Sequence, residues 1–184
     1  MSYEVTLQIL TKLAAAHKER KDFVKAVKSR FTKLGSGAFR IGFSAEGLEY
    51  AFKLRRACPR RGSGFTMAEI RKSNEDEYNT YEAIKSKYPE VAAFVLTPTY
   101  HKLPNGHDVV FMPRVEVLGE NWNYDTDFWD DMSKAQYRLI TCLFSDAHGG
   151  NIGYVGDPEA PGCRLYMIDL NTEGDRWLPH EFAG

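Results

Sequence analysis

The sequence predicts an α+β fold that contains an antiparallel sheet. Three observations lead to this class: apolar residues at helical spacing near the N-terminus, short alternating runs between glycine turns, and one long helical pattern followed by further short strands. The chain has 184 residues, of which 43% are hydrophobic and 27% are charged, so it is long enough to bury a core without disulfides. We expect one globular domain, either undivided or built as two lobes.

The first half of the chain carries these patterns in turn. Residues 3–30 place apolar side chains at helical spacing among Lys and Arg, which predicts one or two helices. The alternating runs that follow predict a three-strand meander. Its strands are expected at residues 31–34, 39–43 and 48–54, with glycine turns at 35–37 and 46–47. A basic loop over residues 55–65 then leads to a helix over residues 67–88, which ends before Pro89.

The second half is predicted to contain shorter elements. Strands are expected at residues 91–97, 100–103 and 109–112, with a Pro104-Asn105-Gly106 turn before the last of them. A loop is expected over residues 116–127, a helix over 128–144, and two short strands at 152–155 and 165–168.

The composition excludes several classes of protein. No apolar run approaches the roughly 18 residues of a membrane span, and residues 1–20 lack the apolar core of a signal peptide. The three cysteines, Cys58, Cys142 and Cys163, are odd in number and have no CxxC spacing, so neither a disulfide framework nor a cysteine zinc site is expected. These features predict a cytoplasmic protein without a membrane partner.

The net charge of −1 conceals an asymmetry along the chain. Residues 1–115 carry 20 Lys and Arg against 12 Asp and Glu, a net charge of +8, while residues 116–184 carry 4 against 13, a net charge of −9. This division fits nucleic-acid binding by the basic half and metal binding by the acidic half, and it fits equally well charges that complement each other across a lobe interface. The basic run over residues 53–61 lacks interleaved stacking aromatics, so a solvated loop explains it more simply than a nucleic-acid interface.

The glycine turn and the strand after it carry the first candidate site. In the segment LGSGAFRIGF, residues 34–43, Gly35, Ser36 and Gly37 can bring backbone N–H groups close to a phosphate, but a hairpin turn that merely needs glycine also explains them. Side chains alternate along a strand, so Ala51 and Lys53 share one face of the third strand. A lysine on a strand face is commonly just solvated, so Lys53 needs a partner.

The long helix provides that partner. One of its faces carries, within about 80° of arc, Ile70, Asn74, Glu77, Tyr81 and Ile84. Glu77 is the one carboxylate in this largely apolar stripe, whereas Glu75 and Glu82 point away from it. Burial of an unpaired carboxylate costs roughly several kcal/mol, so an ion pair with Lys53 is expected. The alternative is that Glu77 lies at the edge of the stripe and reaches water.

The segment SDAHGGNIG, residues 145–153, is the most specific pattern. Asp169 ends the later strand LYMID, so Asp146, Asn151 and Asp169 offer oxygen groups around one point, which suits Mg²⁺. His148 lies in the same loop, but no HExxH pair accompanies it, and an isolated loop histidine is more often structural.

The order of these patterns resembles the protein-kinase-like superfamily over residues 31–171. The shared order is a glycine-rich hairpin, an Ala-x-Lys strand, a helix with an inward Glu, a hydrophobic strand leading into VVFMPRV, and D-x-H-x-x-N before a strand that ends in Asp. The chain is most similar to the small serine/threonine kinases carried by lytic bacteriophages. The D-x-H-x-G-N form is also shared with aminoglycoside and choline phosphotransferases.

The resemblance implies a minimal bilobal kinase-like fold. It comprises an N-terminal helical extension (residues 1–30), an antiparallel-sheet N-lobe with one main helix (31–113) and a strongly reduced C-lobe with the catalytic and metal-binding loops (114–184). ATP would be bound by Gly35, Ser36, Gly37, Ala51, Lys53, Phe111, Met112 and Arg114. Within this set, Lys53 would hold the α- and β-phosphates and pair with Glu77. Ala51 would line the adenine pocket with Phe111 at its back, and residues 112–114 would form the hinge.

The resemblance also implies the catalytic and metal-binding residues. Asp146 would accept or orient the proton of the substrate hydroxyl, His148 would lie near the γ-phosphate, and Asn151 and Asp169 would bind Mg²⁺. Phosphoryl transfer depends mainly on positioning and on neutralising phosphate charge, which these residue types can provide.

Several positions depart from the kinase pattern. Arg40 replaces the usual third glycine, which would stiffen the turn or add a phosphate contact. Residues 144–145, Phe-Ser, replace the usual His-Arg before the catalytic Asp, and Asp169-Leu170-Asn171 replaces Asp-Phe-Gly. Only 15 residues follow Asp169, so no ordinary activation segment or peptide-binding subdomain is expected.

Three functions follow from these expectations. The first is an active minimal serine/threonine kinase, which uses ATP and Mg²⁺ and acts on a protein or on itself in the cytoplasm of a bacterial host. The second is a pseudokinase-like nucleotide-binding module that modulates a host protein without transfer. The third is a small-molecule phosphotransferase. The sequence leaves the phosphoacceptor and the oligomeric state open.

Overall fold

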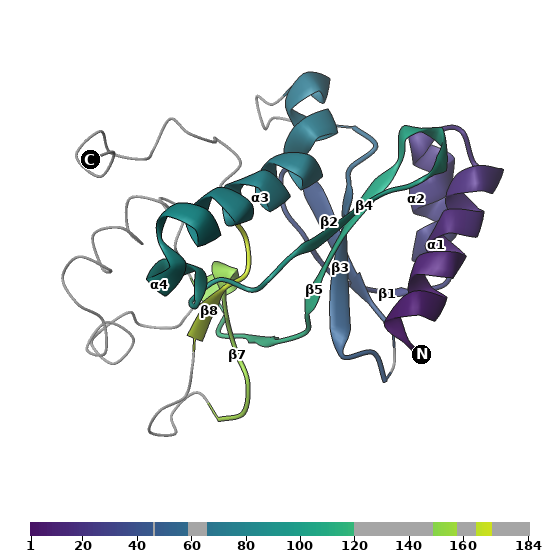
Figure 1. Cartoon of the computed structure of the whole chain (residues 1–184). Coiled ribbons are helices and arrows are strands. Elements are labelled where there is room, and N and C mark those ends of the chain that lie inside the picture. Colours follow the sequence, from purple (N-terminus) through teal and green to yellow (C-terminus); the bar gives the residue numbers. More distant parts are fainter. Residues whose placement is uncertain (46, 59–65, 120–148, 158–164, 171–184) are drawn as a thin grey trace. The chain divides into compact units, whose positions relative to one another are not determined.

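The computed structural model describes residues 1–45, 47–58, 66–119, 149–157 and 165–170 (Figure 1). These residues form helices and antiparallel sheets, which confirms the predicted α+β class. The chain divides into two compact units. The first, called the sheet unit, comprises residues 1–78 and 98–114, and the second, called the hairpin unit, comprises residues 79–97 and 115–184.

The sheet unit begins with two helices, as predicted. α1 spans Tyr3–Ala16 and α2 spans Arg20–Lys28. The hydroxyl of Ser2 caps α1, since it accepts a hydrogen bond from the Val5 N–H at 3.3 Å. The division of the structure places both helices in one unit with the sheet, whereas the sequence-based division treats residues 1–30 as a separate extension.

The five-stranded sheet contains the predicted meander and the predicted hairpin. Its strands are β1 (Thr32–Ser36), β2 (Arg40–Ser44), β3 (Tyr50–Arg55), β4 (Thr99–Lys102) and β5 (Asp108–Pro113). All neighbours pair antiparallel in the order β1-β2-β3-β5-β4. The short helical turn η1 (Pro104–Gly106) joins β4 to β5, and it requires Asn105 and Gly106 because both have positive φ angles, 58° and 69°.

The two faces of this sheet have different chemistry. One face is apolar and packs against α1 and α2, with Phe43, Phe52 and Phe111 in the core beside Leu10 and Phe23. The first half of α3 lies against the other face (Figure 1). That face carries the charged side chains of Lys53 and Arg40, which pair with Glu77 of α3. The N-terminal helices therefore cover the apolar side of the sheet.

α3 spans Met67–Lys87 and ends before Pro89, as predicted. Its start is a capping box, in which the Glu69 carboxylate accepts from the Thr66 N–H at 2.6 Å and the Thr66 hydroxyl accepts from the Glu69 N–H at 3.3 Å. The predicted strand over residues 91–97 is wrong. Pro89–Ala92 forms the short helix α4, and Val95 makes only an isolated bridge with Met167. Short apolar runs fit either structure, and Pro89 at the first helical position favoured the helix.

The hairpin unit contains a three-stranded antiparallel sheet in the order β6-β7-β8. The helical turn η2 (Gly149–Asn151) leads into β7 (Ile152–Tyr154), which pairs with β6 (Glu116–Val117) and β8 (Leu165–Met167). The predicted strands at 152–155 and 165–168 are confirmed. The predicted loop over 116–127 is wrong at its start, where β6 forms, and residues 120–127 and the predicted helix over 128–144 lie outside the described residues.

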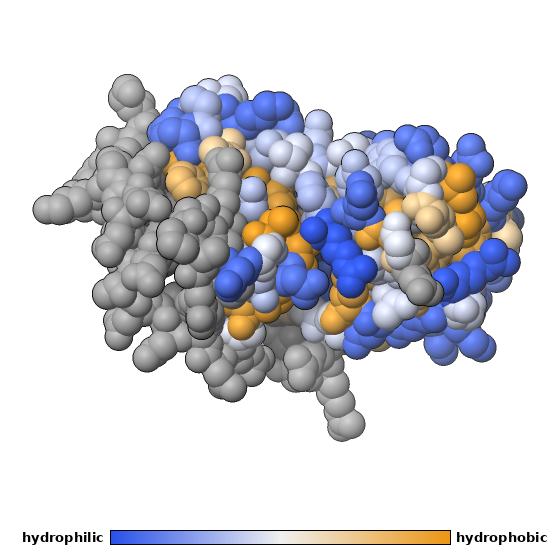
Figure 2. Space-filling view, turned by 90° about the horizontal axis from the view of Figure 1, so that it is seen from below, coloured by the Kyte–Doolittle hydropathy of each residue, from blue (hydrophilic) through white to orange (hydrophobic). Residues whose placement is uncertain are grey.

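The described surface carries scattered apolar side chains. The large exposed ones are Met1, Val5, Leu34, Tyr50, Met67, Val117 and Val155. On the face drawn in Figure 2, hydrophobic areas alternate with hydrophilic ones. No helix in the described part of the chain is both long and apolar enough to span a membrane.

Candidate functional site

Lys53 and Glu77 form the ion pair that the sequence predicts. Nζ of Lys53 lies 2.8 Å from Oε1 of Glu77, and Glu77 is only 1% exposed. All five residues of the predicted stripe on α3 are buried. By contrast, Glu82 is exposed, and Glu75 forms an exposed ion pair with Lys102. The alternative in which Glu77 reaches water is therefore wrong.

Arg40 is a second cation on the same carboxylate. Its guanidinium forms an ion pair with Oε2 of Glu77 and donates a hydrogen bond to the Ser73 carbonyl at 3.3 Å, and the residue is 6% exposed. Lys53, on β3, thus contacts one carboxylate oxygen of Glu77, and Arg40, on β2, contacts the other. Of the two expectations for Arg40, a stiffer turn and a phosphate contact, this geometry favours the stiffer turn.

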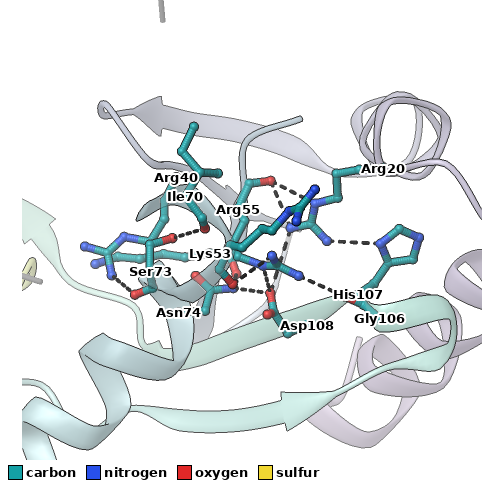
Figure 3. Close-up of polar contacts among 11 residues, drawn as sticks. Arg20, Arg40, Lys53, Arg55, Ile70, Ser73, Asn74, Gly106, His107 and Asp108 are labelled. Atoms are coloured by element: carbon teal, nitrogen blue, oxygen red, sulfur yellow. Dashed lines mark hydrogen bonds and ion pairs between the residues drawn. The ribbon is translucent and has the colours of Figure 1, made fainter. Parts of the chain in front are cut away.

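A second buried polar cluster lies around Asp108 on the same side of the sheet (Figure 3). Nε of Arg55 lies 2.7 Å from Oδ1 of Asp108, and the amide of Asn74 donates to the same oxygen at 2.9 Å. The remaining guanidinium nitrogens of Arg55 donate to the carbonyls of Arg71 and Gly106, both at 2.8 Å. The expectation that Arg55 begins a solvated basic loop is wrong, because Arg55 is the last residue of β3 and is buried.

Arg20 and His107 connect this cluster to α2. The Arg20 guanidinium donates to the Arg55 carbonyl at 2.9 and 3.1 Å and to Nδ1 of His107 at 3.3 Å, while Nε2 of His107 donates to the His17 carbonyl at 2.8 Å. Burial, and then the nearby Arg55 charge, lower the pKa of Arg20 to about 10, and Asp108 partly offsets them. Burial also lowers the pKa of His107, so its neutral ring accepts from Arg20.

The glycine turn is closed by a hydrogen bond from the Gly37 N–H to the Arg40 carbonyl at 3.1 Å. Neither Gly35 nor Gly37 has a positive φ, and a Cβ atom added to either would meet no heavy atom within 4 Å. Neither backbone strain nor crowding inside the described structure requires glycine there. A side chain at either position would therefore fit the described backbone without a clash.

The strand register decides which predicted pocket residues share a face with Lys53. Ala51 pairs with Met112, and Lys53 pairs with Val110, so these four residues lie on the side that faces α3. Phe111 pairs with Phe52 and belongs to the apolar core under α1 and α2. The expected position of Phe111 at the back of a pocket lined by Ala51 does not fit this register.

The other predicted site residues of the sheet unit lie at strand ends. Ser36 is the exposed last residue of β1, opposite Ile41 on β2. Arg114 follows β5 directly, and its N–H donates to the Glu49 carbonyl at 2.8 Å. Residues 112–114 are thus the end of β5 and the last residue of the sheet unit, and the hairpin unit begins again at residue 115.

In the hairpin unit, the structure brings the two predicted metal ligands to one end of a β-hairpin. Asn151 directly precedes β7 and Asp169 follows β8, and the Ile168 N–H donates to the Asn151 carbonyl at 3.0 Å. Both residues are half-buried. Gly153 allows this close packing, because a Cβ atom there would lie 2.3 Å from Cγ2 of Val115 and 2.8 Å from Cγ2 of Ile168.

The remaining predicted residues, Asp146 and His148, lie outside the described residues. Within the described ranges, no three His, Cys, Asp or Glu side chains gather as a metal site would require. Asn151 and Asp169 supply two oxygen donors, the type that Mg²⁺ prefers.

No protein-family model matches this sequence, and no curated protein matches it either. A functional assignment therefore depends on the geometry of these residues.

Sequence patterns missed Arg40 as a partner of Glu77 and missed the cluster of Arg55, Asp108 and Asn74. One signal was available: strand alternation places Arg55 on the same face as Lys53. Pairing with Asp108 depends on the register between β3 and β5, which are separated by more than 50 residues.

Proposed function

We propose that this chain is an ATP- and Mg²⁺-dependent phosphotransferase with a kinase-like bilobal fold, which transfers the γ-phosphoryl group to a serine or threonine hydroxyl of a protein. The observation that carries the proposal is the buried ion pair between Lys53 and Glu77. A lysine held by a buried carboxylate keeps its ammonium group at a fixed position on the sheet, where it can bind phosphate oxygens.

The surroundings of Lys53 support the same assignment. Gly42 and Val110 flank Lys53 in the sheet, and Ala51 and Met112 lie on the same face. Small and apolar side chains beside a cation suit a nucleotide, whose base is flat and apolar and whose phosphates are anionic. The glycine turn lies at the end of the same β1–β2 pair, and its Gly35 and Gly37 leave open space where a Cβ atom would otherwise lie.

In the proposed reaction, the acceptor hydroxyl oxygen attacks the γ-phosphorus of ATP. The bond from that phosphorus to the oxygen bridging the β- and γ-phosphates breaks, ADP leaves, and Asp146 takes the hydroxyl proton. Lys53 holds the α- and β-phosphates, and Glu77 keeps Lys53 in place. Positioning and charge neutralisation account for most of the catalysis of such reactions.

Asn151 and Asp169 fit the role of Mg²⁺ ligands in the proposal. Both carry side-chain oxygens, and both lie at one end of the β7–β8 hairpin. Mg²⁺ supplies charge neutralisation on the phosphate oxygens when it is bound.

Transfer of label from γ-labelled ATP tests the proposal. The wild type is expected to label protein, and Asp146→Ala is expected to reduce the rate by about 10²–10⁴-fold, since a general base is lost. Asp169→Ala is expected to abolish the Mg²⁺-dependent transfer of label to protein.

Three other results would each contradict transfer to protein. A higher melting temperature with Mg²⁺ and ATP but no transfer of label would identify a nucleotide-binding module. Label on choline or an aminoglycoside, and not on protein, would identify a small-molecule phosphotransferase. Salt-sensitive retention on DNA or RNA, without an effect of ATP, would identify a nucleic-acid binder.

A further inference from the structure

We propose that Arg40 is a positioning residue that fixes the glycine turn to α3 through Glu77. The Glu77 carboxylate then fixes the positions of both the turn and the Lys53 ammonium group. The proposal rests on the proposed function in one respect, namely that the ligand of the turn and of Lys53 is ATP with Mg²⁺. The contact of Arg40 with α3 is itself independent of that assignment.

The division of Glu77 between two strands is the first observation. Oε1 of Glu77 contacts Lys53 on β3, and Oε2 contacts Arg40 on β2. All three side chains are largely buried: taken without the backbone, the side chain of Glu77 is 2% exposed, that of Lys53 14% and that of Arg40 7%. Charged groups in such surroundings have little freedom to rearrange, because a buried charge that loses its partner raises the free energy of the folded state.

The short connection between Arg40 and the turn is the second observation. The carbonyl of Arg40 accepts the hydrogen bond from the Gly37 N–H that closes the turn. The side chain of the same residue contacts Glu77 and the Ser73 carbonyl on α3. One residue thus contacts the glycine turn with its backbone and α3 with its side chain.

The exposure of the surrounding hairpin explains why this contact matters. Residues 32–37 are all exposed, and the β1–β2 register is irregular between Lys33 and Gly35. Arg40 is the first buried residue after the turn. A glycine at position 40 would have no side chain for this contact, so arginine gives the turn an attachment to α3 that glycine does not.

The main test compares Arg40→Met with Arg71→Met, which removes the same charge from an exposed position on α3. Calorimetry measures the Kd for Mg²⁺ with a non-hydrolysable ATP analogue, and hydrogen exchange measures protection of the peptide that covers residues 34–40. Arg40→Met is expected to weaken binding about tenfold or more, since hydrogen bonds to a charged group are lost. Exchange of the turn is expected to rise. Arg71→Met is expected to match the wild type in both measurements.

The conservative variant Arg40→Lys separates positioning from general stability. It keeps a buried cation beside Glu77, and it is expected to recover part of both the affinity and the protection. If Arg40→Met fails to fold, Arg40→Gln, which also removes the charge, is compared with the wild type, and wild-type affinity together with wild-type exchange in Arg40→Gln would overturn the proposal.

Further outcomes distinguish this proposal from the proposed function. A wild type that does not bind the analogue contradicts the proposed function, while the exchange comparison still tests the attachment of the turn. A variant with normal exchange but weak binding, or with raised exchange but normal binding, would overturn the proposed positioning role of Arg40.

Discussion

Arg55 on β3 and Asp108 on β5 form a buried ion pair, with Nε of Arg55 2.7 Å from Oδ1 of Asp108. The same carboxylate oxygen accepts from the amide of Asn74 on α3, and the Arg20 guanidinium lies 3.9 Å away. Asp108, itself on β5, therefore connects β3, α3 and α2 at one point of the sheet unit. Four largely buried polar groups converge there, so the loss of the carboxylate leaves cations in a largely buried site without their partner.

We expect Asp108→Ala to reduce the free energy of unfolding by about 3–5 kcal/mol, the range for breaking a buried ion pair by removal of one partner. Urea denaturation followed by circular dichroism measures this change. Glu82→Ala is the matched control, because Glu82 is an exposed carboxylate on α3. A loss for Asp108→Ala as small as that of the control would show that solvent reaches the cluster.

Stability is expected to fall as the pH decreases below about 6.5. Burial lowers the pKa of His107 below its ordinary value of 6.5, and the Arg20 and Arg55 charges act in the same direction, while the His17 carbonyl and Asp108 act against it. The unfolded chain then binds a proton more readily than the folded chain, so acid favours unfolding. The measurement is the unfolding free energy between pH 7.5 and 5.5.

The variant His107→Gln, which keeps an N–H donor for the His17 carbonyl, is expected to flatten this pH dependence. Burial also lowers the pKa of His101, so His101→Gln is expected to remove a further part of the slope. An unchanged slope in the double variant would place the titrating group elsewhere.

Two glycine substitutions should differ in their effects on stability. Gly153→Ala places a methyl group 2.3 Å from Cγ2 of Val115 and 2.8 Å from Cγ2 of Ile168, and both β-branched side chains are stiff. We expect a loss of about 1–3 kcal/mol. Gly35→Ala meets no atom within 4 Å, so its stability should stay within about 0.5 kcal/mol of the wild type. Thermal denaturation of the two variants tests this contrast, and equal losses would contradict it.

Three of the glutamates of α3, namely Glu75, Glu77 and Glu82, should differ in their effect on nucleotide binding. Glu77→Ala removes the partner of Lys53, whereas Glu75→Ala and Glu82→Ala remove exposed carboxylates. We expect the rise in melting temperature caused by ATP with Mg²⁺ to be lost or strongly reduced only in Glu77→Ala. The shift is measured for each variant against its own melting temperature without nucleotide. Equal shifts in all three variants would mean that the Lys53–Glu77 pair has no part in binding.

The elements with strong local signals were predictable from the sequence. α1, α2, α3, the β1–β2–β3 meander and the β4–β5 hairpin all lie close to their expected positions. The segment after Pro89 was predicted wrongly as a strand, because its short apolar run fits a strand as well as a helical turn, and Pro89 at the start was the one local signal for the helix. The expected position of Phe111 failed for a related reason, since its face depends on the register with β3.

The sequence by itself determined that Glu77 faces inward and needs a cation, because helical periodicity and the cost of burying a carboxylate are local properties. Only the tertiary structure decided that Arg40 shares this carboxylate with Lys53, that Arg55 pairs with Asp108, and that α1 and α2 cover the apolar face of the sheet. These contacts join residues that are distant in the chain, so they depend on strand register and on the packing of helices against a particular face. No local pattern of residues contains that information.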